Sequence, residues 1–95
     1  IYELRGVRNV IIPDGVTSLG SGAFYGCASM VSLTIPASVT IIGKSALAGC
    51  TQLTSINFGG TKAQWEAIEK GDKWGPSSLY NCIAHCTDGD ITIEH

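Results

Sequence analysis

The apolar positions of this chain repeat with a period of 23 residues. Ile12-Pro13 recurs as Ile35-Pro36, and Gly26-Cys27 recurs as Gly49-Cys50. Further pairs keep the residue or its character: Val16 and Val39, Leu19 and Ile42, Gly20 and Gly43, Ala23 and Ala46, Phe24 and Leu47, Met30 and Leu53, Leu33 and Ile56. A fixed period between about 20 and 29 residues is typical of a solenoid in which successive coils stack on one another.

Within one repeat, the spacing of the apolar residues fits neither a helix nor a single strand. Leu33-Thr34-Ile35 alternates and predicts a short strand. Pro36 ends that strand, because proline cannot donate to a strand ladder. Val39 and Ile42 then form a second side of the coil. A shift of 23 residues places like on like, which predicts parallel strands about 4.8 Å apart.

The rest of the repeat predicts a corner and a short turn. Gly43 is expected at a corner where the backbone needs a positive φ. Residues 44–48 are expected to form one helical turn, and Gly49 is expected to stop it.

A different pattern follows Phe58, where we expect the repeats to end. Thr61 and Gln64 match a capping box, which predicts a helix over residues 61–70 that is closed by Gly71. Trp65 gives this helix an apolar side. Together with Trp74, it could form a platform for stacking a sugar, but packing over the end of the coils is the simpler interpretation of such large aromatic side chains.

A hairpin is expected at the end of the chain. Residues 82–87 and 90–94 flank Asp88-Gly89, a dipeptide typical of two-residue hairpin loops. The sequence therefore predicts one domain over residues 1–95, with repeats over about 7–58 and a C-terminal cap over 59–95. Its class is an α/β or mainly-β solenoid with short parallel strands.

Composition narrows the possible partners. The chain has 95 residues, of which 44% are hydrophobic and 15% charged, and its net charge is −2. A basic stripe that could neutralise phosphates is missing from the sequence, which argues against nucleic-acid binding. No apolar run approaches the roughly 20 residues that span a bilayer, so we expect no membrane insertion. The sequence carries no signal peptide and starts inside a repeat, which suggests an excerpt of a longer polypeptide.

The four cysteines are expected to carry free thiols. Cys27 and Cys50 share one repeat position, so their side chains should run parallel about 4.8 Å apart. A disulfide needs Cβ atoms that converge to about 3.8 Å. We therefore interpret these two cysteines as small apolar residues of the core.

Two clusters near the C-terminus suggest metal binding at first sight. Cys82, His85 and Cys86 have zinc-ligand chemistry, but a closed structural site needs four ligands, and on a strand His85 points away from both cysteines. The same residues lack an oxyanion hole and an orienting acid, which argues against a catalytic thiolate. The second cluster alternates like the first half of a calcium loop, but Ile93 stands where such a loop needs glycine. That second cluster comprises Asp88, Asp90, Thr92 and Glu94.

The repeat resembles the BspA-like leucine-rich repeats of bacterial surface proteins. In the second copy, the motif reads Met30-Val31-Ser32-Leu33-Thr34-Ile35-Pro36, then Val39, Ile42-Gly43, Ala46-Leu47 and Gly49-Cys50; the first copy has Ile12-Pro13, Val16, Leu19-Gly20, Ala23-Phe24 and Gly26-Cys27. Leu47 departs from the usual aromatic residue. The resemblance implies a protein-binding module that is extracellular or on the cell surface, with a role in adhesion or host binding. It implies neither an enzyme nor a cofactor, and the sequence offers no metal site.

The residues between the buried strand positions are expected to face outward as a weakly charged binding surface for a protein or a glycan. They are Arg8, Asn9, Ile11, Ser32, Thr34, Ser55 and Asn57. The alternative is an architectural end piece of a longer repeat stalk with no ligand site of its own. In either case no polar cap precedes the first repeat, so the N-terminal end is expected to support homo-oligomers through an unpaired strand edge.

Overall fold

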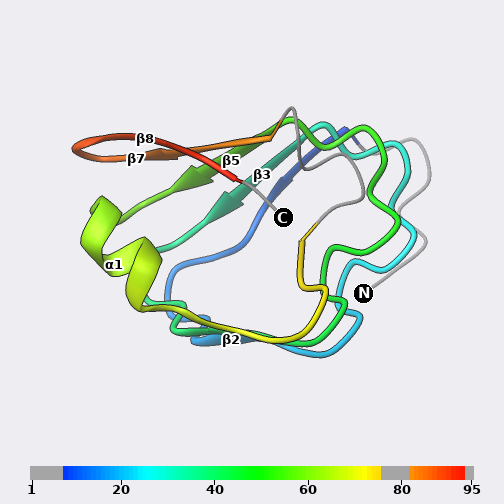
Figure 1. Ribbon diagram of the computed structural model, residues 1–95, viewed down its shortest axis with the longest axis horizontal. Coiled ribbons are helices and arrows are strands. Elements are labelled where there is room, and N and C mark those ends of the chain that lie inside the picture. The colour runs from blue at the N-terminus through cyan, green and yellow to red at the C-terminus, as the bar shows by residue number, and fades with distance from the viewer. Residues whose placement is uncertain (1–7, 76–81, 94–95) are drawn as a thin grey trace.

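Each of three successive coils of the chain contributes one strand to each of two sheets, and a hairpin adds two more strands to the larger sheet (Figure 1). The structure is a computed structural model, and it describes residues 8–75 and 82–93. The larger sheet has the order β1-β3-β5-β7-β8. Its strands are β1 (Asn9–Ile11), β3 (Ser32–Ile35), β5 (Ser55–Phe58), β7 (Ile83–Cys86) and β8 (Gly89–Thr92). The smaller sheet has the order β2-β4-β6 and is made of β2 (Ser18–Leu19), β4 (Ile41–Ile42) and β6 (Glu69–Lys70).

The register of the strands confirms the 23-residue period. Val10 pairs with Leu33 and Leu33 with Ile56 in the larger sheet, while Leu19 pairs with Ile42 in the smaller one. All pairs in both sheets are parallel except β7 with β8. The coils therefore stack with like residues on like, as expected for a repeat solenoid.

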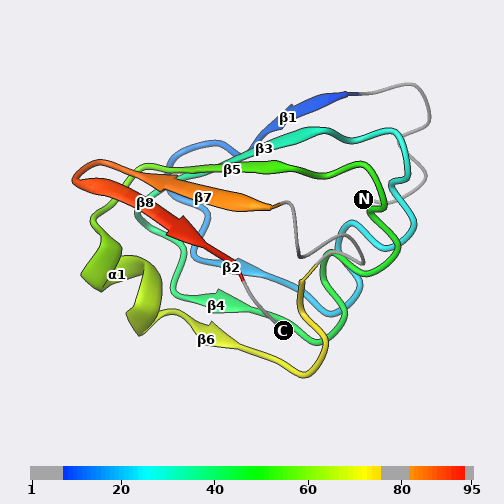
Figure 2. The same ribbon diagram turned by 45° about the horizontal axis from the view of Figure 1, so that its top comes forward.

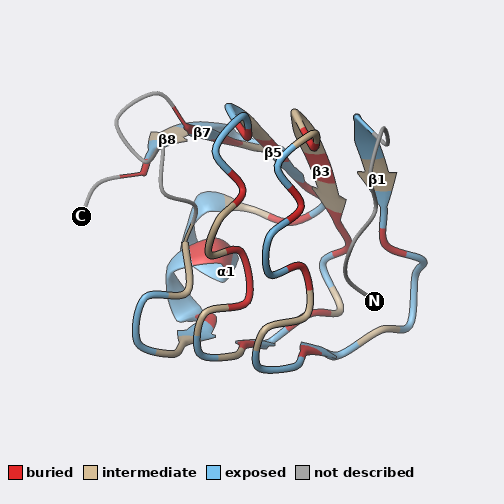
Figure 3. Ribbon diagram, turned by 90° about the vertical axis from the view of Figure 1, so that its right-hand side faces the viewer, coloured by how far each residue is buried: buried red, intermediate tan, exposed pale blue. Residues whose placement is uncertain are grey.

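The core lies between the two sheets and follows the repeated apolar positions. Leu33, Ile35, Ile42 and Ile56 have no exposed surface. Each such side chain contributes about 1.5–3 kcal/mol relative to full exposure, so the stacked rows supply most of the stabilisation. Figure 3 shows buried positions alternating with half-buried or exposed ones along β3 and β5. No buried polar or charged side chain occurs among the described residues.

Gly43 has a different role from the one predicted. Its φ is not positive; instead, a Cβ atom there would lie 2.6 Å from the backbone nitrogen of Ser21 in the preceding coil. Glycine is needed because two backbones approach closely. The helical turn predicted over residues 44–48 is also wrong, because this segment forms a series of tight turns in which Ser45 takes φ 56°. Gly49 does adopt the positive φ, 80°, expected of a stop.

The third coil begins with β5 and continues beyond Phe58, where the 23-residue pattern ends, through a helix to β6. Ile42 pairs with Lys70 and Ile56 with Ala84, so the offset between coils grows from 23 to 28 residues (70 − 42 = 84 − 56 = 28). The extra residues accommodate α1 (Lys62–Ala67). This helix lies between β5 and β6, where the earlier coils have Pro13 and Pro36 between their two strands. Figure 2 shows α1 near the tip of the β7–β8 hairpin on one side and next to the start of β6 on the other.

The capping box at the start of α1 is present as predicted. Gln64 N donates to Thr61 Oγ1 at 3.2 Å, and Thr61 N donates to Gln64 Oε1 at 2.8 Å. The helix is shorter than the predicted 61–70, because Ile68 already has an extended backbone (φ −64°, ψ 130°). Glu69 and Lys70 leave the helix to join β4.

The hairpin predicted near the C-terminus exists, but its loop is one residue earlier. Cys86 pairs with Gly89, so the two loop residues are Thr87 and Asp88. Gly89 belongs to β8 and takes φ 140°, a conformation that glycine adopts without strain. The dipeptide Asp88-Gly89 therefore marks the hairpin without being its loop.

Candidate binding surface

The outer side of the larger sheet carries two continuous rows of side chains, which we call the outer sheet face. Because neighbours along a strand point to opposite sides, the residues flanking the buried Leu33 and Ile56 face away from the core. The first row contains Asn9, Ser32, Ser55, Ile83 and Thr92, and the second contains Ile11, Thr34, Asn57, His85 and Asp90.

Six of the seven residues predicted for binding lie in these rows. Asn9, Ile11 and Asn57 are exposed, whereas Ser32, Thr34 and Ser55 are half-buried between neighbouring strands. The side-chain amide of Asn57 donates to Ser32 Oγ at 3.2 Å. The structure thus brings the six residues together on one surface, and their role in binding stays a prediction.

The seventh residue, Arg8, does not belong to the rows. It is exposed, but it precedes β1 and shares the alternation of Val10 rather than that of Asn9 and Ile11. Its carbonyl accepts hydrogen bonds from Val31 N at 2.7 Å and Ser32 N at 3.0 Å. Arg8 therefore lies at the margin of the surface, and its role in binding stays a prediction.

Four residues of the outer sheet face were missed by sequence reasoning. Ile83 and His85 come from β7, and Asp90 and Thr92 from β8. They were missed because the third coil is longer, so Ala84 does not follow Ile56 at the 23-residue spacing. The strand alternation over residues 82–86 was the signal in the sequence that could have placed Ile83 and His85 on the outer face.

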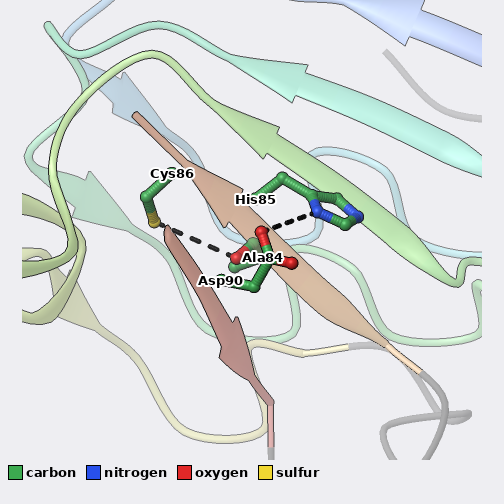
Figure 4. Close-up of polar contacts among 4 residues, drawn as sticks. All are labelled: Ala84, His85, Cys86 and Asp90. Carbon is green, nitrogen blue, oxygen red and sulfur yellow. Dashed lines mark hydrogen bonds and ion pairs between the residues drawn. The ribbon is translucent and has the colours of Figure 1, made fainter. Parts of the chain in front are cut away.

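An ion-pairing contact marks the C-terminal side of this surface. His85 Nδ1 lies 2.9 Å from Asp90 Oδ1 across the β7–β8 pair, and both side chains are open to solvent (Figure 4). An exposed pair of this kind contributes about 0–1 kcal/mol to stability. The pair instead gives the outer sheet face a charged group, the carboxylate of Asp90, and an imidazole that can donate or accept a hydrogen bond.

The cysteines near His85 point away from it, as the alternation predicted. Cys82 is fully buried, and Cys86 is half-buried on the inner side. Burial raises the pKa of the Cys82 thiol to about 11, which opposes nucleophilic chemistry. Burial also raises the pKa of Cys86, and the nearby carboxylates of Asp88 and Asp90 add to this shift.

The described members of the two metal clusters do not come together. Within residues 8–75 and 82–93, no three metal-binding side chains come together. Asp88 accepts the backbone N–H of Lys62 at 2.8 Å, while Asp90 contacts His85. Glu94, the last residue of the calcium pattern, lies outside the described residues.

Cys27 and Cys50 are core residues, as interpreted from their shared repeat position. Both are almost fully buried, and all four cysteines carry free thiols. Cys50 Sγ donates to the carbonyl of Phe24 at 3.2 Å. Burial, with a contribution from Cys27, raises the pKa of Cys50 to about 11.

The tryptophans are packed against each other and provide no open platform. Trp65 is only 3% exposed and meets Phe58 and Trp74 edge-on, with ring centroids 5.5 and 5.8 Å apart. Lys70 Nζ lies 5.0 Å from the Trp65 ring centroid. This geometry rules out the sugar platform at Trp65.

Comparison with known proteins identifies the family. A family model described as "BspA type Leucine rich repeat region (6 copies)" matches residues 2–71. Among solved structures, the chain is similar to a leucine-rich cell surface protein from Faecalibacterium prausnitzii A2-165, with 40% identity and a TM-score of 0.65. The similarity covers 66% of this chain and 17% of that protein. No curated protein matches the chain.

In the part of the chain that the structure describes, no helix has the length and apolar character needed to cross a membrane. The matched family, the 40% identity and the parallel coils agree with one another. The chain belongs to the BspA type leucine-rich repeat family.

Proposed function

We propose that this chain is a non-enzymatic protein-interaction module of a bacterial cell-surface or secreted protein, acting in adhesion or in binding a host component. The observation that carries the proposal is the outer sheet face. It presents polar side chains in register across five strands, among them amides and hydroxyls from four of the strands, with Ile11 and Ile83 as exposed apolar positions. Such a mixture of small polar and apolar groups matches the composition of non-obligate protein interfaces.

The chemistry of the face favours a protein over a glycan as its partner. None of the ten residues in the two rows is Phe, Tyr or Trp, and the imidazole of His85 is paired with Asp90, so the rows lack the large rings on which a sugar usually stacks. The rows instead offer side-chain donors and acceptors next to isolated apolar contacts. The cell-surface location is proposed from the similarity to the Faecalibacterium prausnitzii protein.

The C-terminal elements support an architectural contribution as well. We propose that α1 and the β7–β8 hairpin act as a cap on the last coil. Trp65 and Ile68 are buried there, and Thr87 N donates to the carbonyl of Gly60 at 2.9 Å. In the alternative function, this end piece closes a longer repeat stalk and the outer sheet face binds nothing.

The experiment compares two double variants in binding to a panel of purified extracellular host proteins, measured by biolayer interferometry. Thr34→Arg with Asn57→Arg places two large charged side chains in the middle of the outer sheet face. Thr51→Arg with Gln52→Arg places the same charges on exposed residues of the turn before β5, outside the two rows. We expect the first variant to lose at least tenfold in affinity and the second to bind like the original chain.

Circular dichroism and thermal melting must show that both variants remain folded. A partner that binds both variants equally well would exclude the outer sheet face as its site. If the original chain binds no protein of the panel, the architectural alternative is favoured.

A further inference from the structure

Three polar side chains follow one another on the part of the outer sheet face that lies over β5, β7 and β8. Asn57 pairs with His85, and His85 pairs with Asp90. Neighbouring strands lie about 4.8 Å apart, so the three side chains form a short line across the sheet. Asn57 and Asp90 are exposed, and the His85 side chain keeps 43% of its surface open to solvent.

Each of these side chains retains a hydrogen-bond acceptor that faces solvent. The ionised carboxylate of Asp90 can only accept, so its 2.9 Å contact places a proton on His85 Nδ1 and makes Nε2 of the neutral imidazole an acceptor (Figure 4). The side-chain nitrogen of Asn57 donates to Ser32 Oγ, which leaves Asn57 Oδ1. Within residues 8–75 and 82–93, no donor reaches Asn57 Oδ1, His85 Nε2 or Asp90 Oδ2. We call these three atoms the acceptor row.

The two rows of the outer sheet face contain no lysine or arginine that could balance the carboxylate of Asp90. Lys62 does reach the hairpin, since a Cβ on Gly89 would lie 3.3 Å from the lysine ammonium nitrogen. Gly89 alternates with Asp90 along β8, so Lys62 approaches from the side opposite to the Asp90 side chain. Arg8 precedes β1, at the other edge of the five-stranded sheet. The acceptor row therefore carries a net negative charge.

We infer that the outer sheet face binds its protein partner through an arginine side chain of that partner, seated on the acceptor row; this inference rests on the proposed binding function of the face. A guanidinium is planar, carries five N–H donors and keeps its charge, so it matches a carboxylate and neighbouring acceptors at once. Hydrogen bonds between two charged groups are stronger than neutral ones. Ile83, which is 36% exposed in the adjacent row, offers an apolar surface to the carbon chain of the arginine.

Other donors match the acceptor row less well. A lysine ammonium is a compact, strongly hydrated charge without the planar fork that reaches several acceptors together. Hydroxyls and amides donate without charge and leave the carboxylate of Asp90 without a cationic partner. The occupant is therefore assigned as an arginine, and a lysine or a neutral donor is an outcome that the test detects.

The test uses the full chain and three small probes: Nα-acetyl-arginine methylamide, the citrulline derivative with an uncharged urea in place of the guanidinium, and the lysine derivative. Binding is followed by NMR on isotope-labelled protein. We expect the arginine probe to cause saturable shifts at Asn57, His85 and Asp90, the citrulline probe to cause none, and the lysine probe to bind more weakly. Asp90→Asn should reduce the affinity for the arginine probe about tenfold or more, because a hydrogen bond to a charged group is lost.

Asp14→Asn is the matched control, because it removes one carboxylate from an exposed turn outside the two rows. It should leave the shifts unchanged, and circular dichroism checks that both variants fold. Absence of shifts with the arginine probe, or equal affinities of Asp90→Asn and the original chain, would show that the inference is wrong. Equal binding of the lysine or the citrulline probe would overturn the assignment to arginine.

A host protein that binds the chain separates this inference from the proposed function. If its binding is lost in Thr34→Arg with Asn57→Arg and weakened about tenfold in Asp90→Asn, both are supported. If its binding is lost in the double variant but unchanged in Asp90→Asn, the face binds protein without the arginine, so only the inference fails. If no protein of the panel binds, the proposed function fails, while the three probes still decide whether the acceptor row takes a guanidinium.

Discussion

The backbone N–H of Lys62 donates to Asp88 Oδ1 at 2.8 Å, which fastens the tip of the β7–β8 hairpin to the first turn of α1. This contact joins residues 26 positions apart in the sequence. A carboxylate at a helix N-terminus satisfies a free N–H and interacts favourably with the helix dipole. Asp88 thus acts on a helix to which it does not belong.

Removing this carboxylate should destabilise the C-terminal elements. We expect Asp88→Ala to lower the free energy of unfolding by about 1 kcal/mol, the usual effect of losing a helix-capping side chain. Urea denaturation measures the change. Asp90→Ala is the matched control, because its exposed contact with His85 should be worth less than about 0.5 kcal/mol. Equal effects of the two substitutions would show that Asp88 does not cap α1.

Two isoleucines test the division between core and outer sheet face. Ile35→Ala should lower the free energy of unfolding by about 2–5 kcal/mol, since this side chain has no exposed surface and its loss leaves a cavity. Ile11→Ala should change it by no more than about 0.5 kcal/mol, because Ile11 is 75% exposed. Chemical denaturation of both variants checks the difference. A large loss of stability in Ile11→Ala would mean that this side chain is covered in solution.

The thiols should differ in their reaction with iodoacetamide under native conditions. Cys86 is half-buried and should be alkylated first. Cys27, Cys50 and Cys82 are buried and should react only after the chain unfolds, because the thiolate must form and be reached by the reagent. Mass spectrometry of tryptic peptides over a time course identifies the order. Early labelling of Cys50 would contradict the burial of the thiol pair.

Stability should fall in alkaline solution, and Cys50, like Cys82, should contribute to the loss. Burial raises the pKa of the Cys50 thiol from 9.0 to about 11 in the folded protein. The contribution of the protonated thiol is therefore fully present below pH 9.0 and is lost as the pH rises towards about 11, where the unfolded chain is already ionised. Urea midpoints measured from pH 7.5 to 10.5 follow this loss. Cys50→Ala should show a shallower decline, and an equally steep decline would assign the effect to other groups.

A charge reversal tests the lysine that occupies a core row. Lys70 follows Leu19 and Ile42 in register, and its ammonium donates to the carbonyl of Trp65 at 2.8 Å. Burial lowers the pKa of Lys70, while Glu66 acts in the opposite direction. Lys70→Glu would place a carboxylate against carbonyl oxygens, so we expect a loss of about 2–3 kcal/mol in unfolding free energy.

Lys44→Glu is the control for this reversal, because Lys44 is exposed on a turn and its reversal should cost less than about 0.5 kcal/mol. Thermal and urea unfolding of both variants provide the comparison. If the two reversals cost the same, the contacts of the Lys70 ammonium contribute nothing measurable.

Sequence reasoning succeeded where a residue's role depends on the repeat itself. The pairing of Leu33 with Ile56 follows from the period, because stacked coils place equivalent residues side by side. The outward direction of Ser32 and Thr34 follows from strand alternation. The capping box of Thr61 and Gln64 was also predictable, since all its contacts lie within four residues.

The sequence alone determined the period, the parallel stacking, the apolar rows and most of the outer sheet face, because these depend on local alternation and on self-similarity. Only the tertiary structure decided that Gly43 serves close approach rather than positive φ, that a third coil passes through α1, and that His85 and Asp90 complete the face. The role of Gly43 depends on how closely the backbones of two adjacent coils approach, which the period alone does not give. The other two features depend on contacts between residues without an equal spacing in the chain. Because the third coil is offset by 28 residues, the 23-residue pattern does not predict these contacts. Only the packing of the coils brings the strands into register.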